Sequence, residues 1–95
     1  MKTIYIDFTD LGDYDDFYAQ LKEKLTLPGF FGDNLDALYD AITGFLELPL
    51  HIEFVNMSVE QLETFEDLLV TLEDADEEIE DFTFSYFLVQ YGDEE

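Results

Sequence analysis

The chain has 95 residues, with 25 acidic and only three basic side chains, and its formal net charge at pH 7 is -22. Nucleic acids and anionic membranes are excluded as expected partners, because binding them requires basic side chains that neutralise phosphate groups. The absence of Cys excludes disulfides, thiolate metal sites and cysteine nucleophiles. A basic protein is the expected partner.

The length and the hydrophobic content predict one domain over residues 1–95. Hydrophobic residues make up 47% of the chain, which is enough for one modest core despite the charge. Asp7 interrupts the N-terminal segment before the apolar region of a signal peptide could form, and no stretch approaches the length of a membrane-spanning helix. We expect a monomer in the cytoplasm.

The N-terminal part of the chain predicts a strand and then a helix. Residues 2–8 alternate and are rich in Ile, Tyr and Phe, as is typical of a strand. Residues 13–25 have the pattern of an amphipathic helix. Asp13 can cap this helix, and the apolar side chains of Phe17, Leu21 and Leu25 recur at every fourth position. Pro28 and Gly29 end this pattern.

A short second helix is expected after an aromatic loop. Asp33 or Asn34 can cap this helix, which should reach Thr43 and stop at Gly44. A period of about 3.6 residues per turn places its apolar side chains on one inward side, namely Leu35, Leu38, Ile42 and Phe45.

The outer face of this second helix carries Asp36, Tyr39, Asp40 and Thr43. Like charges one turn apart cost roughly 0.2 to 0.5 kcal/mol, and Asp40 also lies near the helix C-terminus, where the helix dipole disfavours an anion. Stability alone would therefore not select this pair. The two aspartates are either ordinary solvated charges or paired acceptors for Arg and Lys of a partner.

The second half of the chain predicts a strand, a long helix and a last strand. Residues 51–55 alternate, with His51 and Glu53 on the wetter face. Ser58 and Gln61 form a capping-box signature before a helix that should run to Glu78, with inward residues Leu62, Phe65, Leu69 and Leu72. Residues 82–91 form a nearly continuous run rich in aromatic side chains, as in a strand covered on much of both faces. This order predicts an α/β fold with right-handed parallel crossovers.

Catalytic and metal-binding motifs are not found. An EF-hand that began at Asp13 would need Gly and Glu where the sequence has Tyr18 and Lys24. His51 is the single histidine, and a lone histidine on a strand is usually structural. Carboxylates on adjacent turns of one exposed helix provide no cleft for hydrolysis. We predict no enzyme activity, no metal site and no cofactor.

Residues 27–40, LPGFFGDNLDALYD, resemble the central segment of the barstar family of ribonuclease inhibitors. The similarity continues at Thr43, Gly44, Phe45, Glu47 and Pro49. The resemblance implies a barstar-like fold, with a small three-stranded parallel sheet packed against three to four helices. It also implies an immunity-type inhibitor that plugs the active site of a basic ribonuclease, either a barnase-like enzyme or another toxin nuclease.

The resemblance also implies roles for individual residues. Asp40 would stand in for a substrate phosphate, and Asp36 would pair with an Arg of the enzyme. Asp74 would add a third acidic contact, with Glu73 as a neighbouring candidate. The implied partner-binding set is Phe30, Asp36, Tyr39, Asp40, Thr43, Gly44, Phe45, Glu47 and Asp74. Three of these depart from the family pattern, since Tyr39 and Phe45 replace Trp and Phe30 replaces Tyr.

Two other functions are compatible with the acidity. A nucleic-acid mimic, or another binding module with a target other than a ribonuclease, would spread its contacts over many carboxylates. A fold adapted to high salt would unfold in dilute buffer and have no tight partner. An inhibitor would instead lose most of its affinity when Asp40 alone is replaced.

Overall fold

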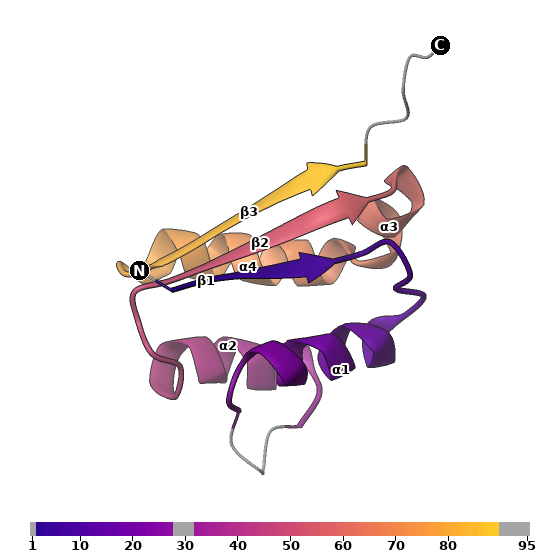
Figure 1. Cartoon of the computed structure of the whole chain (residues 1–95). Helices are drawn as coiled ribbons and strands as arrows, with labels where there is room; N and C mark the ends of the chain where they lie inside the picture. The colour runs from indigo at the N-terminus through magenta and orange to yellow at the C-terminus, as the bar shows by residue number, and fades with distance from the viewer. Residues whose placement is uncertain (1, 28–31, 90–95) are drawn as a thin grey trace.

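The computed structural model describes residues 2–27 and 32–89 (Figure 1). Within these residues the elements follow one another as β1 (Lys2–Asp7), α1 (Tyr14–Lys24), α2 (Leu35–Gly44), β2 (Leu50–Met57), α3 (Val59–Thr64), α4 (Glu66–Glu78) and β3 (Phe82–Leu88). The predicted α/β fold with three parallel strands is confirmed. No helix in this described part is long and apolar enough to span a membrane.

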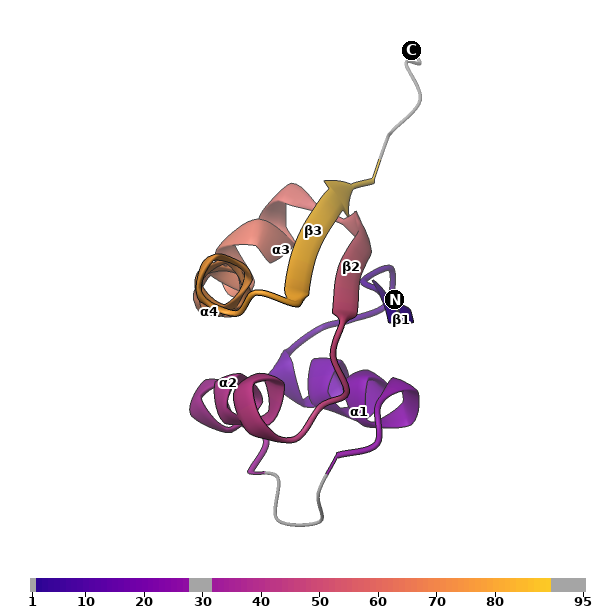
Figure 2. The ribbon, with the colours of Figure 1, turned by 90° about the vertical axis from the view of Figure 1, so that its left-hand side faces the viewer.

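The sheet has the strand order β1-β2-β3, and both strand pairs are parallel. In the register, Ile4 is opposite Ile52, which is opposite Phe84 in turn. Each connection therefore joins one strand to its parallel neighbour, and both connections move the same way across the sheet, from β1 to β2 and from β2 to β3. Both crossovers place their helices on the same side of the sheet (Figure 2).

The two faces of the sheet differ in burial. The face toward the helices is buried in the central part of the sheet, including Ile4, Ile52 and Phe84, whereas Tyr86 near the end of β3 is exposed. On the opposite face Tyr5 and Phe87 are 53% and 54% exposed. The prediction that the last strand is covered on both faces is wrong, because the described helices pack against one face only. Gln90 and Tyr91, which were predicted in this strand, lie outside the described residues.

Aromatic rings fill the centre of the core between the sheet and the helices. The ring centroid of Phe8 lies 4.7 Å from that of Phe54 and 5.2 Å from that of Phe65, which it meets edge to face. Such edge-to-face contacts stabilise a core beyond the area that they bury. The largest fully buried side chains are Phe8, Phe17, Phe54, Phe65, Phe82, Ile6, Leu21, Leu38, Ile42, Leu50, Ile52 and Met57.

The long helix predicted from Ser58 to Glu78 is in fact two helices, α3 and α4, separated at Phe65. The predicted capping box is present, since Ser58 and Gln61 each accept from the backbone of the other. The Gln61 amide also donates to the carbonyl oxygens of Phe8 and Leu11 at 2.7 and 2.9 Å. These bonds hold α3 to the loop after β1, while Phe65 points into the core. The chain therefore turns between the two helices.

The predicted caps of the first two helices are confirmed. Asp13 accepts from the backbone N–H of Asp16 at 3.1 Å. Asn34, rather than Asp33, caps α2 by accepting from the N–H of Ala37 at 2.8 Å. The second helix runs through Gly44, one residue beyond the predicted end.

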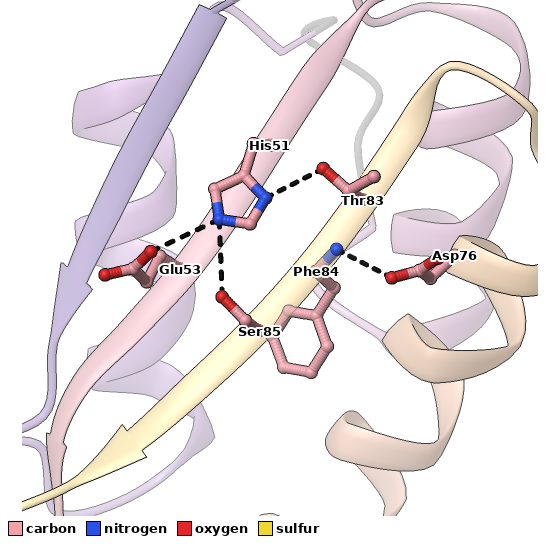
Figure 3. A network of polar contacts seen from close by, with 6 residues as sticks. All are labelled: His51, Glu53, Asp76, Thr83, Phe84 and Ser85. Carbon is pink, nitrogen blue, oxygen red and sulfur yellow. Dashed lines mark hydrogen bonds and ion pairs between the residues drawn. The ribbon is translucent and has the colours of Figure 1, made fainter.

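Side chains partly close both edges of the sheet. On β1, Gln20 accepts from the N–H of Asp7 at 2.8 Å and donates to the Asp7 carbonyl at 3.1 Å. On β3, the Asp76 carboxylate of α4 accepts from the N–H of Phe84 at 3.0 Å (Figure 3). Such contacts use up edge groups that could otherwise pair with another chain.

Candidate partner-binding surface

The helix α2 has one buried face and one exposed face. Leu38, Ala41 and Ile42 are buried in the core. Asp36 and Asp40 are exposed on the other side, as the helical period predicts. The buried side chains hold the helix in place, so the positions of the two carboxylates are set by the core.

Neither Asp36 nor Asp40 takes part in an ion pair within residues 2–27 and 32–89. The one lysine–carboxylate pair of the described residues joins Lys22 to Asp33, with 2.7 Å between the Lys22 Nζ and an Asp33 oxygen. The carboxylates of α2 are therefore open to cations from outside the chain.

The C-terminal end of α2 is also open. The Thr43 hydroxyl donates to the Asp40 carbonyl at 3.0 Å and thereby strengthens the last turn. A Cβ atom built on Gly44 would meet no atom within 4 Å, and Gly44 has no left-handed backbone. Neither crowding nor a special backbone conformation in the described chain explains this glycine. Its small size leaves the helix end accessible to another molecule.

Phe45 is exposed, and its predicted place on the inward side of the second helix is wrong. The residue is 55% exposed, although its backbone N–H still donates to the Ala41 carbonyl at 2.9 Å. The helix ends at Gly44, so the helical period no longer sets the direction of the next side chain. Phe45 and Glu47 line one surface hollow together with Lys2, Leu25, Thr26 and Leu46.

Tyr39 lies at the junction between α2 and α4. Its ring is half-buried against the core, and its hydroxyl donates to the carboxylate of Glu78, the last residue of α4. The hydrogen bond to Glu78, followed by desolvation and by the charges of Glu78 and Asp74, raises the pKa of Tyr39. Sequence patterns did not reveal Glu78, because its partner is 39 residues away along the chain.

Asp74 is exposed on α4, and its charge acts on Tyr39. It precedes Glu78 by one helical turn, so both carboxylates lie on the same side of α4. The structure therefore brings the predicted Asp74 near the edge of α2. Phe30, by contrast, lies outside the described residues, and its role stays a prediction.

The open face of the sheet carries a separate polar cluster (Figure 3). His51 contacts the Thr83 hydroxyl through Nδ1 at 2.8 Å, and both Glu53 and the Ser85 hydroxyl through Nε2 at 3.3 Å. His51 and Glu53 share this face as predicted. Both ring nitrogens have partners from the chain itself, so the cluster links β2 to β3. In the described part no group of three or more His, Asp or Glu residues is placed to hold a metal ion.

An α/β scaffold that presents exposed carboxylates on one helix, with an exposed aromatic residue just after the end of that helix, has the features of a protein-binding protein. The family model described as "Barstar (barnase inhibitor)" matches residues 1–90, and the chain belongs to this family. The chain is also 37% identical over 86 residues to the Bacillus subtilis (strain 168) protein named "Putative ribonuclease inhibitor YrdF". That match covers 85% of this chain and 92% of the relative.

Membership in the family confirms the resemblance carried by residues 27–40. The members are inhibitors and not enzymes, which confirms the prediction that the chain is not an enzyme. The family supports a role in ribonuclease inhibition.

Proposed function

We propose that the chain inhibits a basic ribonuclease by inserting α2 into the active site, with Asp40 in the place of a substrate phosphate. The observation that carries this proposal is the pair of exposed carboxylates, Asp36 and Asp40, on a helix whose opposite side is locked into the core. A carboxylate forms short, charge-assisted hydrogen bonds with Arg and Lys, which are the groups that a ribonuclease uses to bind phosphate.

The rigidity of α2 favours tight binding. Leu38, Ala41 and Ile42 are almost completely buried, so the helix backbone that carries the two carboxylates does not need to be ordered when the enzyme binds. A surface that is ordered beforehand loses less conformational entropy on association. The remaining negative charge of the chain then accelerates the encounter with a basic enzyme, because it acts at long range.

Residues around α2 extend the proposed contact. Phe45 is an exposed ring beside the end of the helix, and Gly44 leaves room for close approach. Exposed aromatic residues next to charged groups are common anchors of protein interfaces. We place Thr43 and Glu47 at the rim and Asp74 at the α4 side of the same surface.

An inhibition assay with purified barnase, the enzyme in the family description, tests the proposal. Asp40→Ala should raise Kd by about 30-fold or more, as expected of a central charged contact. The matched control is Asp15→Asn, which removes one exposed charge from the first turn of α1. This control should change Kd by about twofold at most, through slower association.

Three outcomes contradict the proposal. Wild-type protein that leaves barnase and the basic ribonucleases of the native host active would exclude inhibition. Equal losses of affinity in Asp40→Ala and Asp15→Asn would indicate a nucleic-acid mimic, whose contacts are spread over many carboxylates. A chain that unfolds in dilute buffer would indicate adaptation to high salt.

We further propose that the chain acts in the cytoplasm as a monomer and protects its host from a toxin nuclease. Fractionation of native cells and sedimentation of the purified protein test the location and the oligomeric state. Survival of cells that express the nuclease, with wild type or Asp40→Ala beside it, tests the protection.

A further inference from the structure

The hydrogen bond from Tyr39 to Glu78 joins the two crossovers of the fold. Tyr39 belongs to α2, between β1 and β2, and Glu78 ends α4, between β2 and β3. The two helices are neighbours on one side of the sheet (Figure 2). The bond therefore ties the proposed inhibitory helix to an element that follows it by more than twenty residues.

Local stability does not explain a carboxylate at this end of α4. The last turn of α4 has no basic residue, and the helix dipole disfavours anions at a C-terminus. Asp74 lies one turn before Glu78 on the same side and repels it. Glu78 is thus a negative charge in an unfavourable place, and the Tyr39 hydroxyl is the donor that compensates for it.

The ring of Tyr39 is well suited to holding a donor in a fixed place. It packs against the core cluster while its hydroxyl reaches the surface. An aromatic ring has only two side-chain torsions, so little entropy is lost when it is held. The raised pKa of Tyr39 keeps the proton on the hydroxyl, and the group stays a donor at neutral and mildly alkaline pH.

We propose that Tyr39 is a positioning residue, which binds Glu78 through its hydroxyl, fixes the last turn of α4 against α2, and thereby holds Asp74 together with Asp36 and Asp40 as one anionic surface. This inference rests on the proposed function. In this role Tyr39 acts through Glu78.

Amide hydrogen exchange of the free protein tests the positioning without a ribonuclease. Tyr39→Phe keeps the ring and removes the hydroxyl, so the amides in the last turn of α4 should exchange about fivefold faster. Glu78→Ala should have the same effect and should also lower the pKa of Tyr39, as followed by NMR of labelled tyrosine. Unchanged exchange in Tyr39→Phe would overturn the proposal.

Dissociation from barnase tests the consequence for binding. Tyr39→Phe and Glu78→Ala should each raise koff about fivefold, and the double variant should be no faster than either one. Glu78→Gln keeps an acceptor for the Tyr39 hydroxyl, so its koff should equal that of the wild type. The lost charge should slow only kon. The control Glu77→Ala removes a neighbouring exposed charge and should leave koff unchanged.

The two proposals fail in different ways. Effects of Tyr39→Phe and Glu78→Ala that multiply in the double variant would show that each residue acts on the enzyme separately, and would overturn the positioning role. Wild-type protein that does not bind barnase would count against the proposed function. Amide exchange would still decide whether Tyr39 fixes α4.

Discussion

The Lys22 ammonium group in α1 lies 2.7 Å from the carboxylate of Asp33, directly before α2. Asp33 has a left-handed backbone with φ of 51°, and Asn34 follows it as the helix cap. The ion pair therefore lies where the chain turns into the helix that carries Asp36 and Asp40. Both side chains are nearly half exposed, which limits the strength of the pair.

Lys22→Gln should lower the free energy of unfolding by at most about 0.5 kcal/mol, because water and salt screen an exposed pair. Urea unfolding at low ionic strength measures this change, and the loss should shrink in 1 M NaCl. Lys24→Gln is the matched control, since it removes the same charge from the same helix. Equal losses of stability in both variants would show that the net charge, and not the ion pair, determines the effect.

Phe65→Ala should lower the free energy of unfolding by about 3 to 5 kcal/mol, since it leaves a cavity beside Phe8 in the centre of the core. Thermal unfolding followed by circular dichroism checks this loss. Val59→Ala in α3 should change stability little, because Val59 is 67% exposed. A small loss of stability in Phe65→Ala would mean that the turn between α3 and α4 is not held by the core.

Asp76→Ala should expose the N–H of Phe84 at the free edge of β3. The loss of this bond should cost about 1 kcal/mol and should also promote self-association when salt screens the charge of the chain. Sedimentation in 0.5 M NaCl measures the association. Glu77→Ala removes an equal charge and should remain like wild type, so association of both variants would assign the effect to charge alone.

The pH dependence of stability should contain a contribution from Asp7. Hydrogen bonds from the Thr9 hydroxyl and backbone, and then from Asn56, lower the pKa of Asp7 below its ordinary value of 3.8. A lowered pKa stabilises the folded chain above that ordinary value, and the stabilisation is lost as the pH falls through the folded-state pKa. The hydroxyl of Thr9 donates to Asp7 at 2.6 Å and is the largest cause.

Thr9→Val should therefore be less stable than wild type at pH 6, and the difference should disappear as the solution is acidified below pH 3.8. Urea unfolding at several pH values checks this convergence. Both side chains are uncharged, so the general repulsion among carboxylates cancels in the comparison. A difference that stays constant with pH would exclude the coupling between Thr9 and Asp7.

The features that follow from neighbouring residues were predicted correctly. Asp13 and the capping box at Ser58 are local, because a cap and its helix lie within a few residues. The same is true of the exposed side of α2, where Asp36 and Asp40 recur with the helical period. The family resemblance then added the target class, which composition and spacing could not provide.

Predictions failed where the direction of a side chain depends on distant contacts. Phe65 continues the apolar period of a helix, yet the bonds of Gln61 to the loop after β1 and the burial of Phe65 divide that helix in two. Phe45 continues the period of α2, but it follows the last helical residue and is exposed. The hydrophobic period predicts the direction of a side chain only for residues within the helix.

Sequence alone determined the parallel order of strands and helices, the acidic face of α2 and, through residues 27–40, the family. The tertiary structure decided which face of the sheet stays open and where the long helix breaks. It also brought Tyr39 to Glu78 and placed Asp74 near the edge of α2. The physical reason is that helix periods and caps act over a few residues, whereas contacts between the two crossovers form only when the sheet brings distant segments together.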